Sequence, residues 1–163
     1  PFFMGYFESL GVPAGHLVWS HPTTPELFME GARRGSIDPC YPSKLAVAHV
    51  HDLLYHLPTS DRPLTHVFFP AIDALPTWLE GVRGTRSCPT STATVESTHA
   101  ALVKEFDVFR QRGIRFMRTF VDLDDPALCA RQLCDDPKTP RCHPPGTRAG
   151  RARGTRGHAR AAR

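Results

Sequence analysis

Two cysteines lie in proline-containing loops that lead into predicted helices, a position that favours thiolate chemistry. Cys40 begins the segment CYPSK, which leads into a helix predicted over residues 42–57. Cys88 begins the segment CPTS, which leads into a helix predicted over residues 94–112. A helix N-terminus stabilises a thiolate, the form of cysteine that attacks electrophiles and binds metals. In a parallel α/β sheet both loops lie at the carboxyl edge of the strands, where ligands usually bind, so we expect the two thiols to be neighbours.

The spacing of these cysteines leaves other interpretations open. Each one alone is as consistent with a small buried core residue, a common role of cysteine. Two thiolates also leave a four-iron cluster two ligands short, so such a site needs ligands from missing sequence or from another subunit. Lys44, in the first turn after Cys40, is suited to stabilise a thiolate, an anionic cluster or a phosphate, or is a solvent-exposed lysine.

The remaining three cysteines are weaker candidates. Cys129 and Cys134 share a predicted helix but point to different faces, so we expect packing roles rather than a shared metal. Cys142 lies next to His143 in a segment with no other sign of a site. The sequence contains no C-x-x-C pair, no glycine-rich nucleotide-binding motif and no serine-hydrolase motif.

The histidines and acidic residues give only ambiguous patterns. His49 and His51 are separated by about 200° around a predicted helix, so they cannot bind one ion together, and we expect His51 to face solvent. Asp122, Asp124 and Asp125 follow a predicted strand. A magnesium site and the capping of a helix both explain this acidic group.

Hydrophobic patterning predicts strands that alternate with helices, which specifies an α/β fold. We expect a Rossmann-like three-layer arrangement with a mostly parallel sheet, truncated at both ends and lacking an N-terminal strand. The best predicted strand ends at Pro70, where an open sheet would release its functional loop. The predicted elements are helices over residues 1–11, 25–34, 42–57, 94–112 and 124–133 and strands over residues 16–20, 64–72 and 114–123.

The charge of the chain is divided unevenly. The 163 residues carry a net charge of +4, but residues 141–163 hold seven of the 20 basic residues and none of the 16 acidic ones. We therefore expect a mildly acidic α/β domain over residues 1–136 and a disordered Arg/Pro/Gly-rich tail over residues 137–163, either a linker or an out-of-frame translation product. The tail has no aromatic residues for base stacking, so we expect no nucleic-acid binding.

The composition also narrows the cellular context. No apolar run approaches the roughly 20 residues that cross a bilayer, so we expect no membrane partner. Five cysteines, an odd number, without a secretory signal argue against a disulfide framework. We therefore expect a cytoplasmic protein.

The order of the motifs resembles an iron–sulfur-associated domain of unknown function, found in proteins related to the 2-hydroxyacyl-CoA dehydratase activases. The resemblance covers roughly residues 1–125 and rests on a Cys-x-Pro-x-Lys segment before a helix with histidine, a Phe-x-Pro type strand and a Cys-Pro pair. These motifs are found at Cys40, Pro42, Lys44, His49, Phe68, Phe69, Pro70, Cys88 and Pro89. The chain departs from the family in having Ala48 where glycine is usual, and in lacking the family's further cysteines and C-terminal half.

The resemblance implies that Cys40 and Cys88 are ligands of an iron–sulfur cluster of the [4Fe-4S] type. The chain would then be a cluster-bearing or accessory domain in ATP-driven, low-potential electron transfer, and not a complete enzyme. Its partners would be an ATPase activase module or a dehydratase subunit. The alternative is a non-catalytic α/β interaction module whose cysteines are buried. A third hypothesis, a basic-tailed nucleic-acid binder, is disfavoured by the acidic body.

Overall fold

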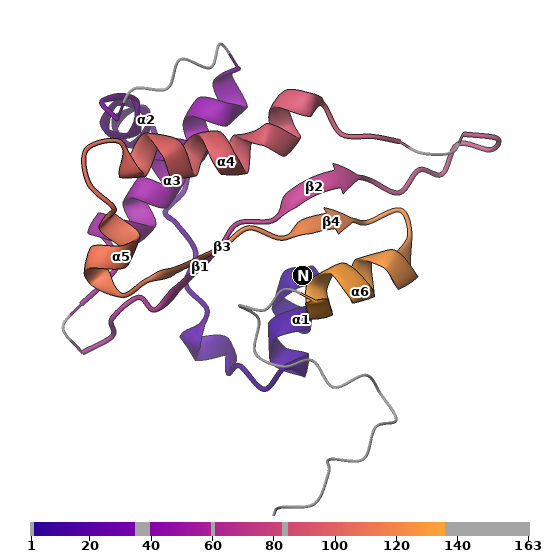
Figure 1. Ribbon diagram of the computed structural model, residues 1–163, viewed down its shortest axis with the longest axis horizontal. Coiled ribbons are helices and arrows are strands. Elements are labelled where there is room, and N and C mark those ends of the chain that lie inside the picture. The colour runs from indigo at the N-terminus through magenta and orange to yellow at the C-terminus, as the bar shows by residue number, and fades with distance from the viewer. Residues whose placement is uncertain (1, 35–39, 60, 83–84, 136–163) are drawn as a thin grey trace, which may run out of the picture.

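The computed structural model describes residues 2–34, 40–59, 61–82 and 85–135. In these residues, helices alternate with short strands, which confirms the predicted α/β class (Figure 1). The elements in chain order are α1 (Phe2–Ser9), a 3-10 turn (Ala14–His16), α2 (Pro25–Ala32), α3 (Tyr41–Tyr55), β1 (His66–Phe68), β2 (Ala71–Ala74), α4 (Pro89–Val103), α5 (Val108–Arg112), β3 (Arg115–Met117), β4 (Phe120–Asp122) and α6 (Pro126–Asp135).

The strands form two parallel pairs that follow one another. β1 pairs with β3, and β2 pairs with β4. Hydrogen bonds from the Phe69 N–H to the Met117 carbonyl (3.0 Å) and from the Ala71 N–H to the Thr119 carbonyl (2.9 Å) continue the pairing across the gap. Pro70 lies in this gap and has no N–H to donate. The strand predicted over residues 64–72 is therefore divided around Pro70 into β1 and β2, and the strand pairing continues beyond Pro70.

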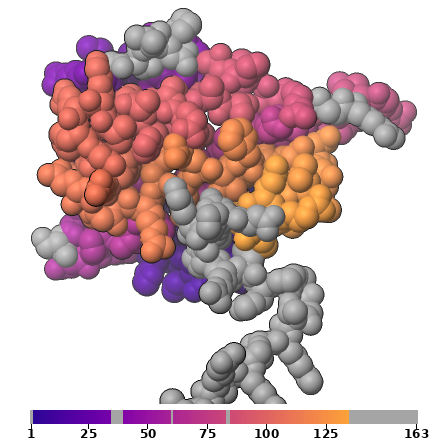
Figure 2. Space-filling view, viewed as in Figure 1, coloured from indigo at the N-terminus to yellow at the C-terminus, as the bar shows by residue number. Residues whose placement is uncertain are grey.

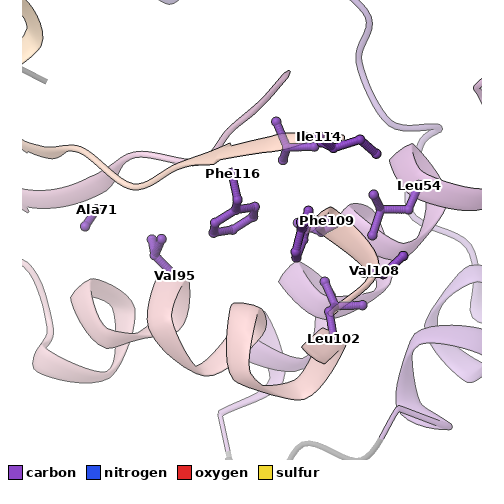
Figure 3. Close-up of a cluster of buried hydrophobic side chains, with 10 residues drawn as sticks. Leu54, Ala71, Val95, Leu102, Val108, Phe109, Ile114 and Phe116 are labelled. Atoms are coloured by element: carbon purple, nitrogen blue, oxygen red, sulfur yellow. The ribbon is translucent and has the colours of Figure 1, made fainter. Parts of the chain in front are cut away.

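Helices lie on both sides of the strands (Figure 1). On one side α3, α4 and α5 enclose the larger hydrophobic cluster (Figure 3), formed by Val50, Leu54, Val67, Ala71, Val95, Leu102, Val108, Phe109, Ile114 and Phe116. On the other side α6 packs on β4 with aromatic residues of α1. There the Tyr6 hydroxyl donates a hydrogen bond of 2.9 Å to the Leu133 carbonyl. Two short strand pairs are not an extended sheet, so the Rossmann-like three-layer arrangement is not confirmed.

The N-terminal part confirms two predicted helices and contradicts one predicted strand. α1 is followed by Gly11, which has a φ of 81°, and α2 begins after Thr24, whose hydroxyl accepts a hydrogen bond of 3.1 Å from the Leu27 N–H. The structure has no strand at residues 16–20. This apolar run is not buried, since Val18 and Trp19 are exposed.

The helix predicted over residues 94–112 is two helices. α4 begins earlier, at Pro89, and ends at Val103. The side chain of Asp107 then caps α5 by accepting a hydrogen bond of 2.9 Å from the Arg110 N–H, and Gly113 ends α5 with a φ of 66°. The strand predicted over residues 114–123 is likewise divided into β3 and β4.

Other sequence predictions fall outside the described residues. The tail predicted over residues 137–163 is one of them, and so is Gly35, which directly follows the helix predicted over residues 25–34. In the described residues α2 ends slightly earlier, at Ala32. Within the described ranges, none of the helices has the length and apolar character needed to cross a membrane.

Candidate functional site

Cys40 and Cys88 are the residues that directly precede two long helices. Cys40 is the N-cap of α3 and Cys88 is the N-cap of α4, and each of these helices has proline within its first two positions. Cys40 is half-buried and Cys88 is exposed. The predicted position before a helix is therefore confirmed, whereas the alternative of two buried core cysteines does not fit.

The two helices that begin at these cysteines pack against each other. The hydroxyls of Ser43, in the first turn of α3, and Thr94, in the second turn of α4, are hydrogen-bonded at 2.9 Å in the buried interface. Near the other ends of the helices, Leu54 and Leu102 belong to one hydrophobic cluster (Figure 3). The helices thus run in the same direction, and their N-termini lie at the same end of the helix pair (Figure 1).

The start of α4 is tied to the carboxyl end of β2. The N–H of Ser87 donates a hydrogen bond of 2.8 Å to the Asp73 carbonyl. The hydroxyl of Thr92 lies 3.3 Å from the Ile72 carbonyl. Cys88 therefore follows the carboxyl edge of the strands, where ligands bind in open α/β sheets. For Cys40, the preceding residues 35–39 lie outside the described part of the chain.

Charged groups lie close to both cysteines in the sequence. Lys44 is half-buried in the first turn of α3, and its backbone N–H donates to the Cys40 carbonyl at 3.1 Å. Arg86, two residues before Cys88, forms an ion pair with Asp73. The first turns of α3 and α4 contain no acidic residue. This end of the helix pair therefore favours an anionic group over a cation held by carboxylates.

Comparison with known families gives one match. The family model described as the CoA enzyme activase uncharacterised domain matches residues 1–155. The chain belongs to this family. No curated protein and no solved structure matches this CoA enzyme activase domain. The family supports the predicted relationship to CoA enzyme activases and leaves the cluster as a prediction.

Among the described residues, the metal-ligating side chains that cluster in threes include no cysteine. The one such group consists of Glu30 on α2, His51 on α3 and His56, the C-cap of α3. Sequence reasoning missed this group, because Glu30 comes from a different helix. The sequence did contain a local signal for one member of the group. Asp52 and His56 are four residues apart, a spacing at which two side chains meet on one helix face, so Asp52 can orient the His56 ring.

The two histidines considered from sequence have different environments. His49 has a structural role, since its Nδ1 lies 2.9 Å from the Ser20 hydroxyl and its Nε2 lies 3.0 Å from the Thr23 hydroxyl. His51, predicted to face solvent, is half-buried. Its ring stacks on Tyr55 with 4.5 Å between the centroids. Desolvation by burial lowers the pKa of His51, and the nearby positive charge of Arg34 lowers it further.

The remaining predictions concern α6 and the turn before it. Cys129 is buried and Cys134 is exposed, which confirms that they occupy different faces. Burial, together with Asp122, raises the pKa of the Cys129 thiol. Asp125 caps α6 by accepting hydrogen bonds of 2.9 Å from two backbone N–H groups, and Asp122 likewise accepts from the N–H of Asp124. The capping interpretation of this acidic group is therefore confirmed. Cys142 and His143 lie outside the described residues.

Proposed function

We propose that this CoA enzyme activase domain is an accessory domain that holds an iron–sulfur cluster of the [4Fe-4S] type through Cys40 and Cys88. The supporting observation is that these cysteines occupy the N-cap positions of two adjacent helices running in the same direction. Each helix N-terminus contributes the equivalent of about half a positive charge. Two such ends beside two thiolates suit an anionic cluster.

The donor set fits a cluster in part. Cysteine thiolates are the usual ligands of iron–sulfur clusters, and four are needed. Cys40 and Cys88 supply two, and we propose that the others come from outside the described residues or from a partner chain. When bound, a cluster supplies one-electron transfer. The chain's own contribution is to hold two thiols on rigid, proline-containing helix starts.

The partner follows from the family. We propose that the domain serves a partner enzyme of the CoA dehydratase system, either an ATPase activase module or a dehydratase subunit, in ATP-driven low-potential electron transfer. In this proposal the domain is not a complete enzyme by itself.

Anaerobic expression of the full chain tests the cluster. We expect a brown protein that contains iron and absorbs at the violet end of the visible spectrum. The Cys40→Ser and Cys88→Ser variants should each lose most of the iron and colour, whereas Cys134→Ser, a matched exposed cysteine on α6, should retain both. A colourless, iron-free protein with a normal circular dichroism spectrum would overturn the proposal.

A second candidate function is binding to a protein partner, and a specific observation favours it. Residues 75–82 and 85–87, between β2 and α4, belong to a hairpin that projects from the body (Figure 2). It is anchored by backbone hydrogen bonds such as that from the Leu75 N–H to the Thr85 carbonyl. It exposes Trp78 almost completely, at 92%, together with Leu79 and Val82. Exposed apolar patches of this kind often bind other proteins.

Co-purification with the activase module tests this second function. Trp78→Ser should weaken the association while the fold is retained. The matched control is Trp19→Ser, which changes an exposed tryptophan elsewhere on the surface. Equal association of both variants with the activase would exclude the hairpin as the binding surface.

A further inference from the structure

A group of metal-binding side chains lies between α2 and the end of α3, at the opposite end of α3 from Cys40. Glu30, His51 and His56 each offer one ligand atom, and these atoms all lie within 4.8 Å of one another. We propose that the three side chains form a binding site for a divalent transition-metal ion of the zinc class. The site is independent of the proposed cluster, since it uses no cysteine.

The donor atoms match the requirements of zinc. Two imidazoles and one carboxylate form the ligand set of many catalytic zinc sites, which keep a further position open. Zinc bonds of about 2.0–2.2 Å place tetrahedral ligand atoms about 3.3–3.6 Å from each other. His56 Nε2 and Glu30 Oε2 are 3.4 Å apart, so this pair already has the spacing of two ligands on one ion.

The orientation of His56 is fixed by a buried carboxylate. Its Nδ1–H donates to Asp52 Oδ1 at 3.0 Å, and Asp52 is 1% exposed. The other oxygen of Asp52 accepts a hydrogen bond of 2.8 Å from the backbone N–H of His21. With the proton on Nδ1, the lone pair of His56 lies on Nε2, toward Glu30. A carboxylate that orients a histidine in this way is the usual support of a metal ligand.

The ring of His51 is held in place and has an unsatisfied atom. It stacks on Tyr55, and its Nδ1 is buried with no hydrogen-bond partner among the described residues. Buried polar atoms normally have a partner, so an exception calls for an explanation. Coordination of the ion by Nδ1 would supply the missing partner.

A cavity beside the three ligands indicates what the open position accepts. It has a volume of about 390 Å³, and its lining includes Glu30, His51 and Glu105 together with the basic side chains of Arg33, Arg34 and Lys104. The guanidinium of Arg34 lies 4.9 Å from the centre of the Tyr55 ring. The three basic groups of the cavity outnumber its two carboxylates. This excess of positive charge favours an anionic fourth ligand, with a carboxylate or phosphate oxygen.

Calorimetric titration of the chelator-treated full chain with Zn²⁺ tests the site. We expect one saturable site, with affinity reduced by about tenfold or more in Glu30→Gln and in His56→Ala. Both side chains are over 40% exposed, so these variants should keep the fold, as checked by circular dichroism. His66→Gln, which changes a histidine on β1, should bind like the unaltered chain. Absence of saturable binding, or equal binding by all these proteins, would overturn the proposal.

Cobalt substitution separates this site from the proposed cluster. Co²⁺ bound by nitrogen and oxygen ligands gives visible absorption bands without the near-ultraviolet charge-transfer band of a cobalt thiolate. We expect this spectrum in the unaltered chain and in a Cys40→Ser/Cys88→Ser double variant. A thiolate band that disappears in the double variant would come from the cysteines, and a double variant that also lacks the visible bands would refute the histidine site. Addition of inorganic phosphate should alter the visible bands if the open position takes an anion, and unchanged bands would contradict that part.

Discussion

The hydroxyls of Ser43 and Thr94 meet at 2.9 Å in the buried interface between α3 and α4. The Thr94 hydroxyl also donates to the Thr90 carbonyl at 2.8 Å, so the Ser43 hydroxyl is the donor of the shared bond. This contact lies one turn into α3 and two turns into α4. It therefore sets the relative position of the helix starts at Cys40 and Cys88.

Ser43→Ala should lower the free energy of unfolding by about 1 kcal/mol, because it removes a buried hydrogen bond but leaves the Thr94 donor satisfied. Urea denaturation measures the change. Ser9→Ala removes an exposed hydroxyl that bonds locally to the Tyr6 carbonyl, and it should change the stability by less than about 0.5 kcal/mol. Equal effects of the two substitutions would show that the buried contact does not stabilise the helix pair.

Gly31→Ala should destabilise the protein by about 1–3 kcal/mol through overpacking. A Cβ at Gly31 would lie 2.3 Å from the Ala48 Cα, so α2 and α3 must move apart. The matched control is Gly5→Ala on α1, where a Cβ meets nothing within 4 Å. There alanine should stabilise the helix by about 0.5–1 kcal/mol. Thermal denaturation of both variants measures the two effects. Midpoints that moved in the same direction would contradict the prediction.

Asp52→Asn should cost about 2–3 kcal/mol, because a buried charged acceptor of several hydrogen bonds is lost. Burial by itself raises the pKa of Asp52, but hydrogen bonds from His21 and His56 outweigh it and hold the pKa below the ordinary value of 3.8. The stability that this carboxylate contributes is thus fully present above that pH and is lost as the pH falls through the lowered pKa. Urea denaturation at several acidic pH values measures this contribution. The free energy of unfolding should depend less on pH in Asp52→Asn than in the parent chain. An exposed control, Asp61→Asn, should show the pH dependence of the parent chain.

Cys129 should react slowly with iodoacetamide in the native protein. The residue is 4% exposed, and burial together with Asp122 raises the pKa of its thiol, so little thiolate is present and access is poor. Alkylation mapped by mass spectrometry should be at least about tenfold faster in urea than in buffer for this cysteine. The exposed Cys134 serves as the internal comparison, with a much smaller difference. Rapid native labelling of Cys129 would mean that α6 leaves the body readily.

Local sequence signals predicted the starts of α2, α3 and α6 to within two residues, because capping residues and prolines act within a few residues. The start of α4, at Pro89, was predicted five residues too late. Strand limits depended on distant partners. Residues 16–20 are apolar enough for a strand, yet Ser20 and the following His21 bond to the side of α3 instead.

The candidate site could likewise be predicted only where it depends on local sequence. The two cysteines follow from their position before helices, whereas their relative placement depends on the packing of α3 on α4. The Glu30 and His56 pair could not be predicted, because it requires the close approach of α2 and α3. That approach rests on Gly31, which meets Ala48 across the helix interface.

The hydrogen bond from Tyr6 to the Leu133 carbonyl joins residues 127 positions apart in the chain. During synthesis, α1 leaves the ribosome long before α6 exists to receive it. The aromatic residues of α1 therefore stay exposed, or bound by a chaperone, until nearly all of the described fold has been translated and α6 can pack against them. Nascent chains that stop before α6 should consequently be the ones that aggregate or recruit chaperones.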